Sequence, residues 1–287
     1  MIPGAFEYHR PQSVDEATAL LEQYGDEAKL LAGGFSLIPM MKLRFAEPAH
    51  LIDMQKIAKL KGVSTTNGCI VIGAMTTQHE LLASPLIAET CPILHEAAKL
   101  IADPQVRYCG TVGGNVANGD PGNDMPAIMM ALDASYVLVS SSGERVVAAD
   151  GFYQGTYFTQ MEPEELLTEI RIPTPAVGHG YSYQKMKRKV GDYATAATAV
   201  ILEMNGATCT KASVSLTNLS STPLRVNANA LVGSDVDASA ITQVVNAAIE
   251  ISDPASDLRG SAEYRRAMAG IMTQRAIEQA LSRAQEG

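Results

Sequence analysis

The spacing of apolar residues predicts a small α/β unit at the start of the chain. Ser13 and Glu16 form a capping-box signature ahead of apolar residues at helical spacing, and Gly25 ends that pattern. Ser36 is expected to cap a second helix, which runs through Met40 to Leu43. Two short apolar runs predict strands, at residues 29–32 and 51–52. This alternation is typical of a parallel-type unit, which we place at residues 1–53.

A second α/β unit is expected at residues 54–177. Its best helix has one continuous apolar face, and Asp124, two residues before Pro126, is a candidate helix cap. The predicted elements are a strand at 69–72, a short helix at 80–82 that Pro85 interrupts, a helix at 92–102, a helix from Asp124 to Leu132, a hairpin at 137–147 and a strand at 166–172.

A proline- and glycine-rich segment at 173–180 marks the clearest boundary of the sequence. Three strand-like runs follow, and Asn205–Gly206, a strong hairpin signal, joins the last two. Two helices then end the chain. We therefore place a sheet-and-helix domain at residues 178–287, and the fold class is a combination of α/β and α+β.

Composition and charge narrow the function. The 287 residues are 46% hydrophobic and carry a net charge of −9, which is typical of a globular protein and argues against a nucleic-acid partner. Residues 1–10 lack the apolar core of a signal peptide, and no run approaches the roughly 20 apolar residues of a membrane span. We expect a cytoplasmic protein without a transmembrane segment.

The residue types that carry catalysis are scattered. The 4 cysteines and 5 histidines show none of the close spacings of iron–sulfur or zinc sites. No nucleophile–base signature is present either. We therefore predict no catalytic residue and no metal ligand in this chain, which favours chemistry performed by a bound cofactor.

Two glycine pairs, Gly33–Gly34 and Gly113–Gly114, are the strongest candidates for ligand binding. Each precedes a segment that can begin a helix, where free N–H groups attract anions, and glycine lets the backbone approach a ligand closely. Ser36, Thr111 and Asn115 add side-chain donors. Neither pair fits the spacing of a Rossmann or phosphate-binding loop. Together the two loops predict a clamp for the diphosphate of a nucleotide cofactor.

Charged residues near these loops have alternative interpretations. Asp120 is expected to cap a helix, whereas Asp124 either caps a helix or accepts from sugar hydroxyls of a ligand. Lys185 and Lys187 belong to the one dense basic patch of the sequence, which is ordinarily a solvated or docking surface. The nearby Tyr193 makes a cofactor contact credible, because its ring can lie against a flat heterocycle.

Three segments resemble a known family. Residues 32–42 and 111–127 are similar to the two FAD-binding loops of the flavin subunits of molybdenum hydroxylases, and residues 257–266 resemble their C-terminal segment. The resemblance covers essentially the whole chain. It implies a vanillyl-alcohol-oxidase-like (PCMH-type) FAD-binding fold with a C-terminal antiparallel sheet plus helices. Phe35 stands where some relatives have histidine, so covalent flavin attachment there is excluded, and Gly119 replaces a common alanine.

The resemblance also implies a set of FAD-binding residues in this chain. They are Ala32, Gly33, Gly34, Phe35, Ser36, Ile101, Thr111, Val112, Gly113, Gly114, Asn115, Asp124, Leu167, Lys185 and Tyr193.

The resemblance further implies partners. A large subunit would carry the molybdenum cofactor and a small subunit the [2Fe–2S] clusters, in a dimer of heterotrimers. The FAD of this chain would pass electrons from the clusters to a quinone or other acceptor. The substrate of the molybdenum subunit is left open, and an N-heterocycle or an aldehyde are among the alternatives. A peripheral position of the protein at the inner membrane face is also left open. A free-standing flavin oxidase and a non-redox nucleotide-binding module are the other interpretations.

Overall fold

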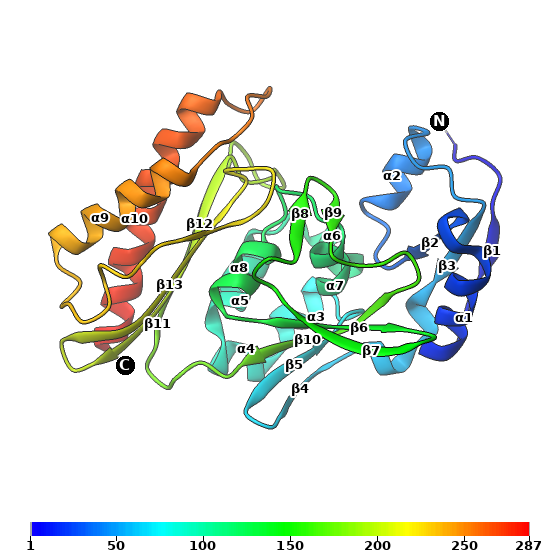
Figure 1. The fold of residues 1–287 in the computed structure, drawn as a ribbon, viewed down its shortest axis with the longest axis horizontal. Helices are drawn as coiled ribbons and strands as arrows, with labels where there is room; N and C mark the ends of the chain where they lie inside the picture. Colours follow the sequence, from blue (N-terminus) through cyan, green and yellow to red (C-terminus); the bar gives the residue numbers. More distant parts are fainter. Residues whose placement is uncertain (1, 287) are drawn as a thin grey trace.

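Three β-sheets of three or more strands follow one another along the longest axis of the molecule, in the order of the sequence (Figure 1). The computed structural model describes residues 2–286. The N-terminal sheet (blue) lies at one end and the C-terminal sheet with its two long helices (yellow to red) at the other. The third sheet lies between them. No helix within the described residues combines the length and apolar character that crossing a membrane requires.

The N-terminal sheet has the order β1-β3-β2, and both outer strands run parallel to β3, as the alternation predicts. The hydroxyl of Ser13 accepts a hydrogen bond from the N–H of Glu16, and Gly25 ends the helix with φ of 49°. The predicted cap at Ser13 and the stop at Gly25 are therefore confirmed. The Glu16 carboxylate, however, accepts from the N–H of Gln12 and not from that of Ser13, so the capping box is incomplete. The elements are β1 (Glu7–His9), α1 (Val14–Tyr24), β2 (Ala28–Leu31), α2 (Leu37–Lys42) and β3 (His50–Asp53), with short 3-10 turns at Gly25–Glu27, Met54–Lys56 and Ala58–Leu60.

The middle sheet is antiparallel, with the order β4-β5-β10-β6-β7. Its strands are β4 (Val63–Thr66), β5 (Cys69–Gly73), β6 (Ser135–Ser140), β7 (Gly143–Ala148) and β10 (Leu166–Pro173), and a separate ribbon pairs β8 (Tyr153–Gly155) with β9 (Phe158–Thr159). The helices are α3 (Gln78–Ala83), α4 (Pro85–Thr90), α5 (Pro92–Leu100), α6 (Pro104–Cys109), α7 (Val112–Ala117) and α8 (Met125–Ala131). Pro85 begins a helix of its own, because proline suits the first turn.

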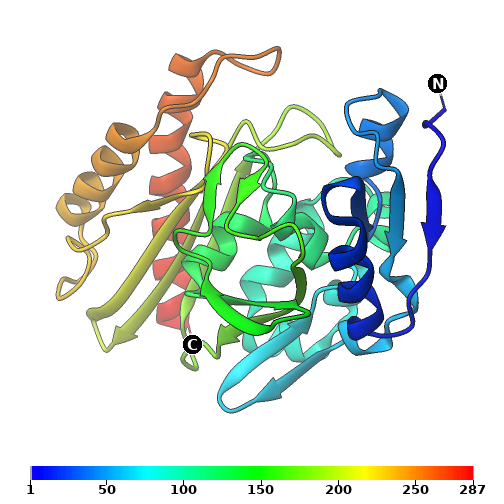
Figure 2. The same cartoon turned by 45° about the vertical axis from the view of Figure 1, so that its right-hand side comes forward.

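The C-terminal sheet is antiparallel, with the order β11-β12-β13-β14. One face packs against α9 and α10, and the other against α8, so the alternate residues of β12 belong to two different cores. Figure 2 shows the two helices on the side of the sheet that faces away from the middle sheet. The elements are β11 (Gly180–Met186), β12 (Ala196–Asn205), β13 (Thr208–Thr217), β14 (Leu224–Val226), α9 (Ala238–Ile251) and α10 (Ala262–Glu286).

Candidate functional site

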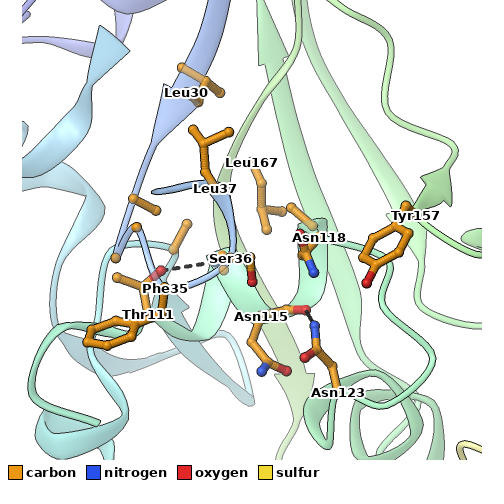
Figure 3. A pocket seen from close by; sticks show the side chains of 18 of the residues that line it. Leu30, Phe35, Ser36, Leu37, Thr111, Asn115, Asn118, Asn123, Tyr157 and Leu167 are labelled. Carbon is orange, nitrogen blue, oxygen red and sulfur yellow. Dashed lines mark hydrogen bonds between the residues drawn. The ribbon is translucent and has the colours of Figure 1, made fainter. Parts of the chain in front are cut away.

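A cavity of about 750 Å³ is lined by residues of all three parts of the chain. This volume lies within the range of cofactor-binding sites. The N-terminal part contributes β2, the first glycine pair and α2, and the middle part contributes α7 and the segment around Leu167. The C-terminal part contributes Lys185 and residues 191–193. Figure 3 shows the labelled side chains of the first two parts around this cavity.

The fold brings the two glycine pairs together, although nearly eighty residues separate them in the sequence. A Cβ atom on Gly33 would lie 2.5 Å from the carbonyl oxygen of Cys109 and 2.7 Å from the Cα of Gly110. A Cβ atom on Gly114 would lie 3.4 Å from the Cβ of Ala32. The two segments are thus in direct contact along one wall of the cavity, the arrangement that a two-sided clamp requires.

The first pair presents free backbone donors. Gly34 has φ of 77°, a conformation that favours glycine, and it places the chain ahead of α2. The N–H groups of Gly34, Phe35 and Ser36 donate no hydrogen bond to any residue between 2 and 286. Successive free N–H groups of this kind form an anion-binding concavity. Ser36 lies at the cap position of α2, but its side chain makes no capping hydrogen bond, so that prediction is wrong.

The second pair differs from the prediction. Gly113 and Gly114 lie inside the first turn of α7, and their N–H groups are already bonded, to Ala74 O at 2.9 Å and to Thr111 Oγ1 at 3.0 Å. The N–H of Val112 likewise donates to another backbone carbonyl. The expectation that both pairs offer unpaired N–H groups to a ligand is therefore wrong for this one. Glycine is needed at position 113 for packing instead, because a Cβ atom there would lie 2.5 Å from the Cβ of Ala74.

Side chains supply the polar groups on this side of the cavity. Thr111 Oγ1 accepts from Gly114, which leaves its hydrogen free to donate, and Asn115 uses its Oδ1 to accept from Met125 N–H. Asn118 has a buried amide nitrogen that finds no hydrogen-bond partner among residues 2–286. In Figure 3, Thr111, Asn115 and Asn118 lie along one stretch of the cavity wall.

Gln78 is the clearest sign that a polar ligand belongs here. It is 2% exposed, it lines the cavity, and neither its amide oxygen nor its amide nitrogen has a hydrogen-bond partner within residues 2–286. A buried polar group left unpaired costs about 1–3 kcal/mol, and native proteins rarely retain one without a reason. Sequence reasoning missed this residue because a glutamine at the start of a short helix carries no motif.

A buried ion pair forms part of the cavity wall. Lys185 Nζ lies 2.8 Å from Asp124 Oδ2, and the two side chains are 1% and 6% exposed. Tyr183 donates to the other carboxylate oxygen at 2.5 Å, and Lys185 also donates to Leu100 O at 3.2 Å. Asp124 precedes α8 but makes no capping hydrogen bond with its side chain, so the capping alternative is wrong. The solvated-surface interpretation of Lys185 is also wrong.

Burial perturbs the titratable groups around this pair. Burial, together with the Asp124 carboxylate, raises the pKa of Tyr183 well above its ordinary value, so the phenol stays a proton donor. Burial lowers the pKa of Lys187, and the neighbouring Lys185 charge lowers it further. Lys187 donates to the same Leu100 carbonyl at 3.4 Å. Lys185 and Asp124 therefore bring a compensated charge pair to the cavity wall, and the Tyr183 hydroxyl donates its hydrogen bond to the Asp124 carboxylate behind them.

The mouth of the cavity carries two tyrosines. Tyr193 packs over Gly122, and the guanidinium of Arg259 lies 5.6 Å from its ring centroid. Tyr157 donates to Asp120 at 3.0 Å, and burial, with the nearby carboxylate, raises the pKa of Tyr157 to about 12. Asp120 also accepts from Gly122 N–H and thus caps a turn, which corrects the prediction of a helix cap.

Fourteen of the fifteen predicted FAD-binding residues line the cavity. The exception is Val112, which is fully buried in the core of the middle part. Further lining residues were not predicted, among them Leu30, Leu37, Gln78, Asn118, Asn123 and Tyr157. The apolar residues Leu30 and Leu37 line the cavity because they belong to β2 and α2. The apolar periodicity of the sequence does not show which side of these elements borders a cavity.

Comparisons with known proteins match nearly the whole chain to one family of flavin-binding subunits. Residues 4–175 match the family described as FAD binding domain in molybdopterin dehydrogenase, and residues 181–280 match the CO dehydrogenase flavoprotein C-terminal domain. The carbon monoxide dehydrogenase medium chains of Afipia carboxidovorans and Hydrogenophaga pseudoflava are 56% and 51% identical, each over 99% of both chains.

A solved structure matches equally well. Reconstituted CO dehydrogenase from Oligotropha carboxidovorans superposes with a TM-score of 0.97 at 55% identity, over 99% of this chain and 100% of the other. The likeness confirms the expected PCMH-type FAD-binding fold. Within the family, the loop sequences predict a resemblance to the medium subunit of aerobic carbon monoxide dehydrogenase, and these relatives confirm that resemblance.

Proposed function

We infer that this chain, which belongs to the family of FAD-binding domains in molybdopterin dehydrogenases, is the FAD-carrying medium subunit of a carbon monoxide dehydrogenase. The full-length relatives of that name support the assignment. In this proposal, a large subunit holds the molybdenum cofactor and a small subunit holds [2Fe–2S] clusters, in a dimer of heterotrimers. Electrons reach the FAD of this chain from the clusters and leave to a quinone or another acceptor.

The observation that carries the proposal is the set of unpaired polar groups around the cavity. The free N–H groups of residues 34–36 suit diphosphate oxygens, while the amides of Gln78 and Asn118 are buried donors without partners within residues 2–286. The apolar walls at Ile101 and Leu167 suit a ring system. The residues present therefore fit FAD, which supplies one- and two-electron transfer when bound.

The proposed roles of the predicted residues follow from this geometry. Residues 32–36 hold the diphosphate through the backbone, and Thr111 and Asn115 hold it through their side chains. Lys185 and Asp124 bind a polar edge of the cofactor, and Tyr193 covers the open end. Phe35 offers no atom for a covalent flavin bond, so the cofactor is held non-covalently. Domain boundaries at 1–53, 54–177 and 178–287 stay part of the proposal.

Purification of the chain with its partner subunits tests the function. We expect one flavin per chain, molybdenum and iron in the complex, and bleaching of the flavin absorbance by carbon monoxide. In the Gly114→Val variant we expect a complex that lacks flavin, because the added side chain meets Thr111 and Ala32. Gly155→Ala is the matched control, since the nearest atom to its Cβ lies 3.8 Å away.

Three results would contradict the proposal. A wild-type complex that lacks flavin would refute the cofactor assignment. A preparation free of molybdenum and iron that still oxidises substrate would instead indicate a free-standing flavin oxidase. Flavin bleaching by an N-heterocycle or an aldehyde, but not by carbon monoxide, would assign the chain to a different hydroxylase of the same family.

A further inference from the structure

Three potential metal ligands meet on the N-terminal sheet, away from the FAD cavity. Glu7 and His9 are two residues apart on β1, so their side chains lie on the same face of the strand. His50 opens β3 and pairs with Glu7 in the parallel register. The scattered histidines of the sequence predict no metal site, and the prediction misses this group because its members are 41 and 43 residues apart.

The distances between the three ligand atoms suit one small cation. His9 Nε2 lies 3.0 Å from His50 Nδ1, and His50 Nδ1 lies 3.6 Å from a Glu7 carboxylate oxygen. All three atoms lie within 4.8 Å of one another. In a tetrahedral zinc site with bonds of about 2.0–2.1 Å, neighbouring ligand atoms are about 3.3 Å apart. The two observed separations lie on either side of that value.

The imidazoles are held in place before any cation binds. The ring of Tyr24, at the end of α1, stacks on His50 with centroids 3.6 Å apart and planes 14° apart. The same ring lies 5.1 Å from the His9 ring. The His50 side chain is 13% exposed and the Glu7 side chain 72% exposed. Two ligands are thus fixed, and the third reaches in from solvent, which leaves an entry path for a cation.

We propose that Glu7, His9 and His50 form a site for a divalent transition cation, with zinc as the expected metal. Two imidazoles and one carboxylate are a zinc-type ligand set, and a water completes the fourth position. The cation takes the place of the hydrogen bond between the two facing imidazole nitrogens, and the proton of that bond moves to the other nitrogen of its own ring. It joins the short edge strand β1 to β3, and it therefore stabilises the N-terminal end of the sheet without touching FAD.

Calorimetric titration of the full-length chain with Zn2+ alone tests the site. We expect one saturable equivalent in the wild type and a loss of affinity of at least about tenfold in His9→Gln and in His50→Gln. His179→Gln is the matched control, because this partly exposed histidine lies outside the group, and its affinity for Zn2+ should be unchanged. Zn2+ should also slow modification of His9 and His50 by diethyl pyrocarbonate.

Glu7→Gln provides an independent variant, since the exposed side chain can be replaced without disturbing the core. It should weaken Zn2+ binding while keeping the wild-type circular dichroism spectrum. Titration without a saturable site, or equal affinity in the wild type and all three variants, would show that the histidines form only a hydrogen bond. Flavin content is unaffected in either case, so failure here leaves the proposed function intact.

Discussion

Replacing Asp124 with asparagine should destabilise the protein strongly, because it leaves the charge of Lys185 buried without its counter-ion. The two side chains are 6% and 1% exposed, and the charged atoms are 2.8 Å apart. Asparagine keeps the size of the side chain and can still accept from Tyr183. The substitution therefore removes the charge and leaves the packing nearly unchanged.

The size of the effect follows from the geometry. Two unit charges at this separation attract by about 6 kcal/mol at an effective dielectric constant of about 20. Removing one partner of a buried pair costs about 3–5 kcal/mol in practice. The bond from Lys185 to Leu100 O at 3.2 Å persists and compensates part of the loss. We expect a decrease in the free energy of unfolding of about 3 kcal/mol, a large share of the roughly 5–15 kcal/mol typical of native proteins.

A double-mutant cycle in guanidinium chloride, on the FAD-free chain, measures the interaction. Asp124→Asn and Lys185→Met should each destabilise the protein. The double variant should be more stable than the sum of the two losses predicts, by at least about 2 kcal/mol. Additive losses, or a loss below about 1 kcal/mol in Asp124→Asn, would refute the conclusion that the ion pair acts as a buried unit.

Three further predictions concern separate features. Gly33→Ala should lower both stability, by about 1–3 kcal/mol, and flavin content, because its Cβ would lie 2.5 Å from a carbonyl oxygen, whereas Gly155→Ala should change neither. Gln78→Leu should raise the unfolding free energy of the FAD-free chain by about 1 kcal/mol and weaken FAD binding measured by flavin fluorescence. Burial raises the pKa of Glu165, but the hydrogen bonds from Arg145 and from the N–H of Glu162, together with the charge of Arg145, lower it more in sum, so its net pKa lies below the ordinary value of 4.5. The ionised Glu165 therefore adds to the free energy of unfolding above pH 4.5, and this contribution is lost as the pH falls through the lowered pKa. In the Glu165→Gln variant, the free energy of unfolding should consequently fall less steeply with decreasing pH in the acid range.

Each of these predictions has a result that would contradict it. Normal flavin content in the Gly33 variant would show that the two loops need not touch. Tighter FAD binding in the Gln78 variant would mean that the orphaned amide does not face the cofactor. An unchanged slope in the acid range for the Glu165 variant would show that the pair with Arg145 is broken in solution.

Local signals in the sequence predicted much of the fold. The cap at Ser13, the stop at Gly25 and the Asn205–Gly206 turn each depend on a few neighbouring residues, and all three are confirmed. The three-residue strands β1 and β14 were missed, because a strand this short is defined by its partner. Apolar periodicity contains no information about a partner far along the chain.

The candidate site was predictable in position but not in chemistry. Both glycine pairs reach the cavity, yet the ion pair exists only because the fold brings Lys185 of β11 next to Asp124, sixty-one residues earlier in the sequence. A cluster of basic residues in a sequence is ordinarily interpreted as solvent-exposed, and only the folded structure shows that Lys185 is buried. Gln78 shows the same limit, because its lack of a partner is a property of the assembled cavity.

The two glycine pairs look alike in sequence and serve different physical needs. Gly34 adopts a left-handed conformation, and the N–H groups of residues 34–36 have no acceptor within residues 2–286, so we propose that the first pair binds the ligand directly. Gly113 is required because a Cβ would collide with Ala74, and its N–H is already used. For the second segment we therefore propose that the side chains of Thr111 and Asn115 bind the ligand. In this proposal the first segment binds through backbone N–H groups and the second through side chains. Substitution can therefore remove the binding groups of Thr111 and Asn115 directly, whereas the backbone donors of residues 34–36 can be changed only by altering the conformation of the loop.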